Sequence, residues 1–174
     1  MQNRTLRQLT AAGVIAAAYA ALSLVLAPIT FGPVQCRISE VLTLLPVISP
    51  AAIWGVTLGC AVTNGVGAAT GANFLGLVDL LVGTAATLLA AVATRLLGKI
   101  RFGGLPWLSA LPPILINAVA IGGEWCYAMT GSINGAFWVF AGQIALGQLP
   151  PCLLGVWLVG LLERRSLQTI IEGK

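Results

Sequence analysis

One base and three acids of this sequence fall in or beside apolar stretches, and their types favour binding over catalysis. These residues are Arg37, Glu40, Asp79 and Glu124. A charged side chain that faces lipid at mid-depth costs about 2.5–3.5 kcal/mol on insertion scales, so the three acids should face the interior of a helix bundle. The local excess of two negative charges favours a cationic or donor-rich ligand, because carboxylates accept parallel N–H bonds well.

Other polar side chains are expected to join these acids in one pocket. Asn117 precedes Glu124 by seven residues and shares its helical face. Asn64 closes the third apolar run at about the same level, and Trp138 and Gln148 lie roughly aligned on the last run. These residues complete the predicted ligand site.

Simpler structural roles remain open for several of these residues. Arg37 and Glu40, three apart, can pair as a structural ion bridge, and Asp79 can be a helix N-terminal acid that faces headgroups. Trp125 and Tyr127 can stack on a ring-shaped ligand or belong to the interfacial aromatic belt.

Several kinds of chemistry are disfavoured by what the sequence lacks. It has no histidine, which removes Ser-His and Cys-His pairs and zincin-type helices. Asp79 is the single aspartate, so an aspartyl dyad is unavailable, and no P-loop motif occurs. We therefore predict no enzyme activity, no metal site and no bound cofactor.

The composition requires lipid as the solvent. The chain is 58% hydrophobic and 8% charged, whereas a soluble domain carries roughly 25% charged residues. We predict one all-α, polytopic membrane domain over residues 1–174. The net charge of +4 is spread over separate clusters, which argues against binding to nucleic acid.

The charge pattern predicts six transmembrane helices. A span needs about 20 residues, and the stretch 38–66 reads as one long helix or as two short ones broken by Pro46 and Pro50. Two short helices bring all three basic clusters, which begin at Arg4, Arg95 and Arg164, to the cytoplasm, together with both termini. The apolar runs are 8–28, 38–49, 51–66, 75–97, 107–129 and 136–162.

The N-terminal run and the cysteines invite other interpretations. The first run resembles a signal peptide, but no polar cleavage region follows it, so we expect an uncleaved helix. The cysteines have no C-x-x-C spacing and are expected to fill space between helices. A pairing of Cys36 with Cys126 is left open.

A ridge of small residues marks the first helix. Ala12, Ala16 and Ala20 follow at intervals of four, which lets another helix approach closely. That helix can belong to this chain or to a partner.

Three stretches of the chain resemble the QueT family. They are Phe31-Gly-Pro-Val-Gln-Cys-Arg-Ile-Ser-Glu-Val-Leu-Thr-Leu-Leu-Pro46, then 50–60 with Asn64, and 79–90. QueT proteins are substrate-binding S components of energy-coupling factor (ECF) transporters, assigned to queuosine precursors. The resemblance implies a six-helix bundle in the plasma membrane.

The resemblance also implies a ligand and partners. The ligand would be a 7-deazaguanine (the aminomethyl or nitrile form, or queuine) captured at the outer face, with residues 31–36 as a lid. The alanine ridge Ala12, Ala16 and Ala20 would dock on a transmembrane T component bound to two ATPases, which use the ATP. Gln148 departs from the acid that family members often carry, so either the pocket prefers a less charged precursor or that position is peripheral.

Three other functions fit the same sequence. The chain can be an S component for another vitamin or nucleobase, a self-sufficient secondary transporter, or a membrane assembly subunit that transports nothing. Ligand binding by the isolated chain and its dependence on ATPase partners distinguish these alternatives.

Overall fold

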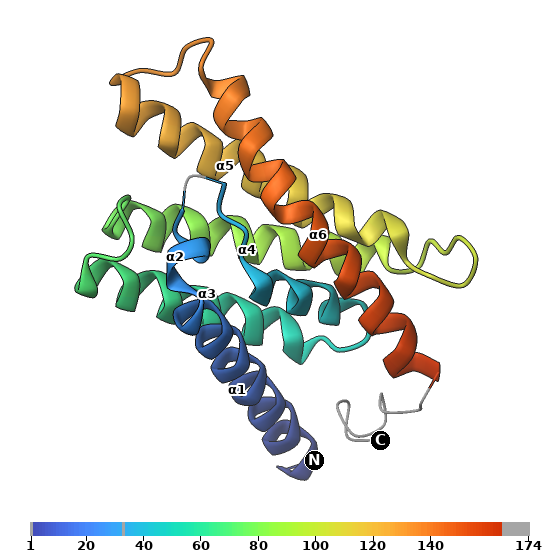
Figure 1. The fold of residues 1–174 in the computed structure, drawn as a ribbon. Coiled ribbons are helices and arrows are strands. Elements are labelled where there is room, and N and C mark those ends of the chain that lie inside the picture. The colour runs from blue at the N-terminus through green and yellow to red at the C-terminus, as the bar shows by residue number, and fades with distance from the viewer. Residues whose placement is uncertain (1, 33, 165–174) are drawn as a thin grey trace.

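The computed structural model describes residues 2–32 and 34–164, whose regular elements are all helices (Figure 1). Pro33 of the predicted lid lies outside the described residues, as do Arg165 and Lys174 of the last basic cluster. The elements are α1 Gln2–Val25, α2 Ala27–Thr30, η1 Ile38–Val47, α3 Ala51–Thr70, α4 Leu77–Leu97, η2 Trp107–Ala110, α5 Leu111–Thr130 and α6 Phe137–Arg164.

Five helices, α1, α3, α4, α5 and α6, are long and apolar enough to cross a membrane. The all-α membrane fold is therefore confirmed, and α4 and α6 begin and end within two residues of the predicted runs. The prediction that Asn64 closes the third helix is wrong, because α3 continues to Thr70. Gly71 then ends the helix in the left-handed conformation (φ 73°), which glycine adopts without strain.

The predicted second span is a short 3₁₀ helix, η1. Its 10 residues rise about 2.0 Å each and cover only about 20 Å, less than the roughly 30 Å of a hydrocarbon core. Pro46 lies inside it, and η1 contacts α1, α3, α4 and α6. A helix too short to cross a membrane by itself is thus surrounded by four that are long enough to cross.

Polar contacts show which helix ends lie together. Arg101, after α4, pairs with Glu163 near the end of α6 at 2.7 Å. Arg95 Nη1 donates to the Pro46 carbonyl near the end of η1 at 2.9 Å. The first turns of α1 and α3 lie at this same end, since η1 leads into α3 and both helices line one groove. We call it the basic end, because it carries these described residues: Arg4, Arg7, Arg95, Lys99, Arg101 and Arg164.

The main apolar core lies between the middle of the bundle and the basic end. It contains Leu44 and Leu45 of η1, Val56 of α3 and Val156 and Val159 of α6. A smaller cluster toward the opposite end consists of Ile121, Trp125 and Ile144. The larger of the two apolar clusters therefore lies toward the basic end, and the smaller one toward the opposite end.

The alanine ridge of α1 packs against α3 within this chain. A Cβ atom at Gly55 or Gly59 would lie 2.8 Å or 2.7 Å from the Cβ atoms of Ile15 and Tyr19 on α1. Ala12 and Ala20 are each only 8% exposed. The ridge thus serves internal packing first. Exposed small residues of α1 include Gly13, Ala17, Ala18 and Ala21.

Candidate ligand-binding site

Arg37 reaches from the segment between α2 and η1 into the centre of the bundle. Its Nη2 donates to Asn64 Oδ1 at 3.1 Å, and its Nη1 to Cys60 Sγ at 3.5 Å. The guanidinium also lies 5.7 Å from the ring centroid of Phe31. Its Nε finds no acceptor among the described residues. Arg37 is therefore fixed by α3 while one donor remains available.

Glu40 lies in the first turn of η1 and is only 1% exposed. Its Oε1 accepts a hydrogen bond from the Tyr19 hydroxyl at 2.5 Å, whereas Oε2 has no partner in the described chain. Within residues 2–32 and 34–164 the ion pair found is Arg101–Glu163 and not Arg37–Glu40. The two residues are thus held by different helices and do not form the structural bridge.

Asp79 lies in the first turn of α4 and is 1% exposed, so it faces the bundle and not the headgroups. Its Oδ2 accepts from Asn73 Nδ2 at 2.8 Å, and its backbone carbonyl accepts from Asn64 Nδ2 at 2.9 Å. Its Oδ1 lacks a described partner. One turn later, Gly83 leaves room for this arrangement, because a Cβ there would lie 2.8 Å from Asn64 Nδ2.

Glu124 approaches the same region from α5. It is partly buried, and neither of its carboxylate oxygens has a hydrogen-bond partner among the described residues. Asp79 is near enough to act electrostatically on this carboxyl group. Two acids from α4 and α5 therefore share one neighbourhood, and neither is neutralised there by an ion pair in the described chain.

A small polar hollow lies between these elements, and we call its lining the central polar cluster. The hollow measures about 10 Å³, roughly the room that one water molecule needs. Four predicted site residues lie here: Arg37 before η1, Glu40 in η1, Asn117 in α5 and Gln148 in α6. The lining is Gln35, Arg37, Glu40, Gly83, Thr87, Asn117, Ile121 and Gln148.

The aromatic residues are arranged differently from the prediction. Trp138 is 76% exposed and meets only the neighbouring Phe137 ring edge-on, so the structure does not bring it to the cluster. Tyr127 is exposed as well. Trp125 instead lies between the rings of Phe74 and Phe140, with centroid distances of 5.6 and 6.5 Å and an interplanar angle of 22° on each side.

Sequence reasoning missed three residues that organise this region, Tyr19, Cys60 and Asn73, and it included a fourth, Gln35, only as part of the lid. Tyr19 is fully buried, and its hydroxyl donates to Glu40. Cys60 Sγ accepts hydrogen bonds from Arg37, Asn64 and Thr87. Gln35 and Asn73 are buried loop residues, where helical spacing gives no signal. Tyr19 could have been found, because a buried tyrosine hydroxyl usually needs a polar partner.

The cluster has unused hydrogen-bonding capacity, since Glu40 Oε2 and Arg37 Nε have no described partner. One carboxylate, that of Glu40, lines the hollow together with Arg37, and Asp79 lies beside Gly83 of the lining, whereas Glu124 is outside it. The described residues contain no group of three or more His, Cys, Asp or Glu that could hold a metal ion. Cys36 and Cys126 are both free, so they do not form a disulfide.

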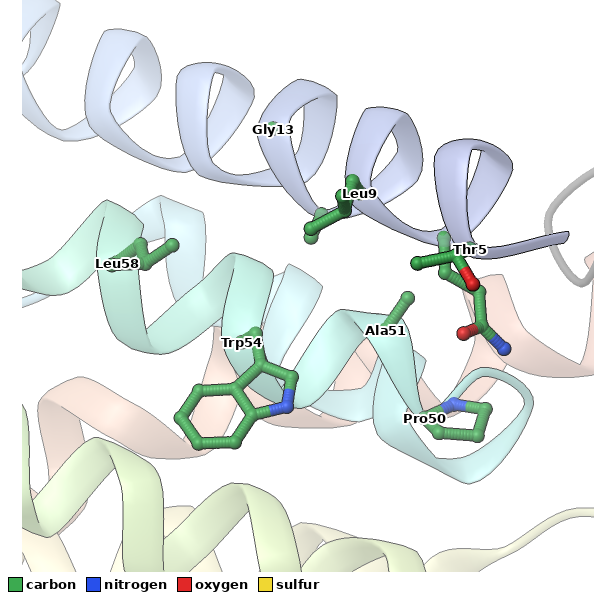
Figure 2. Close-up of a pocket in the computed structure, with 9 residues that line it drawn as sticks. Thr5, Leu9, Gly13, Pro50, Ala51, Trp54 and Leu58 are labelled. Carbon is green, nitrogen blue, oxygen red and sulfur yellow. The ribbon is translucent and has the colours of Figure 1, made fainter. Parts of the chain in front are cut away.

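A larger groove of about 570 Å³ runs between α1 and α3 near the basic end. Its exposed apolar side chains include Leu9, Trp54 and Leu58. Figure 2 shows Leu9 and Ala51 pointing toward one another across the groove, whereas the Trp54 indole extends away from α1. The groove is apolar and separate from the central polar cluster.

Comparison with known proteins places the chain in a family. No curated protein and no solved structure was found to match it. The model of the QueT transporter family matches residues 9–164, which is nearly the whole chain and includes every residue of the central polar cluster. The chain therefore belongs to the QueT transporter family.

Proposed function

We propose that this multi-pass protein of the plasma membrane is the S component of an ECF transporter and binds a queuosine precursor, a 7-deazaguanine, in the central polar cluster. One observation carries the proposal. Glu40, Asp79 and Glu124 come from three different elements, and each has a buried carboxylate oxygen without a described partner. Glu40 lines the hollow itself, and Asp79 lies beside Gly83 of its lining.

The ligand chemistry follows from these oxygens. Leaving a buried acceptor without a hydrogen bond costs about 1–3 kcal/mol, and more for a charged group. A deazaguanine carries N–H and NH₂ donors on one edge, which suit Glu40 or Glu124. The cationic aminomethyl group of one precursor suits the paired charges of Asp79 and Glu124. Stacking beside Trp125 would add flat contact area.

The proposed orientation places both termini and the basic end in the cytoplasm, with six passes of the chain when η1 is counted. Lys and Arg favour the cytoplasmic side, and the described basic residues outside the cluster gather at one end. Asp79 lies at the start of α4, whereas Arg95 lies at its end. The acids would then be in the outer half, where a solute arrives.

Binding requires the hollow to open. Its volume of about 10 Å³ is far below the roughly 300–1,000 Å³ of typical ligand pockets. Gln35, from the predicted lid, lines the hollow and has a φ of 46°, which is uncommon for a residue other than glycine. We propose that this segment moves outward to admit the ligand.

We propose that the face formed by α1 and α3 docks on the T component. The groove between these helices offers exposed apolar side chains near the proposed cytoplasmic end (Figure 2). Of the predicted docking residues, Ala12 lines this groove, whereas Ala16 and Ala20 lie further along α1 against α3. ATP would be used by the partner ATPases.

Calorimetry on the purified protein tests the ligand. We expect binding of the aminomethyl or the nitrile deazaguanine and no binding of thiamine or pyridoxine at the same concentrations. Binding of thiamine or pyridoxine without a deazaguanine would identify an S component for another vitamin. Binding of none of these compounds would contradict the proposed ligand class.

Uptake into vesicles tests the transport mechanism. We expect accumulation of the deazaguanine only when the T component and the ATPases are reconstituted with this chain and ATP is supplied. Accumulation by this chain alone, driven by an ion gradient, would contradict the S-component assignment and indicate a secondary transporter.

A further inference from the structure

A second polar hollow lies at the basic end of α4, far along that helix from Asp79. It has a volume of about 550 Å³. Its lining contains three basic residues and no acid, and the remaining residues are aliphatic or glycine. We call it the basic cleft and define it by its lining: Val47, Arg95, Leu96, Gly98, Lys99 and Arg101.

The cleft lies where the short η1 ends. Val47 is the last residue of η1, and the chain then turns toward α3. Gly98 packs directly against Val47, because a Cβ atom at this glycine would lie 2.9 Å from Val47 Cγ1. Val47 and Gly98 thus form a close-packed wall, and the basic side chains extend around it.

The charges of the cleft are only partly satisfied within the chain. Arg101 is paired with Glu163 through two hydrogen bonds of 2.7 and 2.8 Å. Arg95 donates to a neutral carbonyl, that of Pro46, and Lys99 is exposed. Arg95 and Lys99 therefore leave two positive charges facing the cleft. The preference of basic residues for the cytoplasmic side explains their presence but not a cleft of this volume.

The apolar surface beside the cleft indicates what occupies it. One face of α4 is exposed along its length, through Leu81, Leu89 and Val92 to Leu96. These spacings of three, four or eight residues keep the side chains on one helical face. In a membrane this face meets acyl chains, and its last residue, Leu96, also lines the cleft. A single molecule can thus contact the apolar stripe and the two cations together.

We propose that the basic cleft binds an anionic phospholipid, with the phosphate between Arg95 and Lys99 and an acyl chain along Leu89 and Leu96. Basic pockets between membrane helices at the cytoplasmic side suit such headgroups. Continuity with the lipid-facing stripe favours a lipid over a protein partner. This site does not depend on the substrate proposed for the central polar cluster.

Native mass spectrometry of the protein released from nanodiscs tests this site. The nanodiscs contain equal amounts of phosphatidylglycerol and phosphatidylcholine. We expect the wild type to retain phosphatidylglycerol preferentially. Each removed charge weakens retention roughly fivefold, which corresponds to about 1 kcal/mol per Lys or Arg near a membrane surface. Lys99→Gln should lose about fivefold and Arg95→Gln/Lys99→Gln roughly 25-fold.

The matched control is Arg4→Gln, which removes an exposed charge at the same end but outside the cleft lining. We expect it to retain the lipid like the wild type. Equal retention in all variants, or an equal loss in Arg4→Gln, would overturn the proposal. Lys99→Gln removes an exposed side chain, so its result stands even if the double variant folds poorly.

A competition experiment separates the lipid from a free anion. Glycerophosphoglycerol, the headgroup without acyl chains, should compete at least tenfold more weakly than the intact lipid, because it lacks contact with the apolar stripe. Equal competition would indicate a site for soluble phosphates. Unchanged lipid retention combined with loss of T-component binding in Lys99→Gln would indicate a protein contact instead.

Discussion

The two halves of the bundle differ in the chemistry of their buried side chains. Toward the basic end, Leu44 of η1 packs in one apolar core with Val156 and Val159 of α6, and all three side chains are completely buried. Toward the opposite end, buried side chains such as Glu40 and Asp79 are charged and only partly hydrogen-bonded. The first half can hold the fold together without a ligand, whereas the second retains unmet hydrogen-bonding capacity.

The difference indicates which half stabilises the fold and which half we propose binds the ligand. Close packing within the apolar core leaves little to gain from a ligand there, because its buried side chains already have neighbours. In the central polar cluster, each buried polar atom without a hydrogen-bond partner lowers the stability of the folded protein. A ligand that supplies the missing hydrogen bond can restore this stability. A truncation in the apolar core should therefore lower stability, whereas removal of a partnerless acid should weaken ligand binding.

The largest effect is expected in the apolar half. Leu44→Ala should lower the free energy of unfolding by about 2–5 kcal/mol, because Leu44 is completely buried and alanine leaves a cavity. Thermal unfolding in detergent measures the loss. Leu89→Ala, at a lipid-facing position, is the control and should change stability little. Equal losses in both variants would remove the distinction between the halves.

The next largest effect concerns ligand affinity. Glu124→Gln should weaken binding of the aminomethyl deazaguanine by roughly 10- to 150-fold, because a charged hydrogen bond contributes about 1.5–3 kcal/mol. The thermal unfolding temperature without ligand should not fall, since Glu124 has no hydrogen bond to lose in the described structure. Calorimetry provides the affinity.

Glu163→Gln is the matched control for that experiment. It removes the same charge at the basic end, where Glu163 pairs with Arg101. Affinity should remain that of the wild type. If Glu124→Gln binds normally as well, the acids are not the recognition groups, and an assembly subunit becomes the better interpretation.

A smaller effect is expected from added volume inside the cluster. Gly83→Ala forces a Cβ atom into the space of Asp79 and Asn64, and such overpacking costs about 1–3 kcal/mol. Binding should weaken because both side chains must move. Gly123→Ala is the control, since no atom lies within 4 Å of its added Cβ. Similar affinities for both variants would show that the spacing at Gly83 is unimportant.

The smallest effect is expected at Trp138. Because this side chain is 76% exposed, Trp138→Leu should leave ligand affinity within about twofold of the wild type, as is usual for surface positions. Trp125→Leu provides the contrast, since its ring is stacked between Phe74 and Phe140. A greater loss in Trp138→Leu would restore the sequence-based site and contradict the arrangement seen here.

Much of the fold could be predicted because a bilayer permits few solutions. Apolar runs of sufficient length must be helices, so α4 and α6 lie close to the predicted ranges. The 3₁₀ geometry of η1 could not be predicted, because it depends on the helices that surround it. Likewise, Ala12 and Ala20 show a close approach but not which helix approaches.

The site could be predicted only where charge and helical spacing agree. Glu40 and Asp79 had to face the protein, since lipid exposure is costly, and Asn117 lies on the hollow as predicted. The structure does not bring Trp138 to the hollow, and the sequence could not show this because an apolar helix gives no periodic signal that separates lipid from protein. The ligand roles of all these residues stay predictions.

The small hollow has a consequence for the time course of uptake. Since it has room for about one water molecule, a base of the proposed ligand class would enter only through an expanded conformation. Association should then be slower than diffusion allows and level off at high ligand concentration. The same barrier should delay escape, so that a captured molecule remains long enough for the transport cycle to finish.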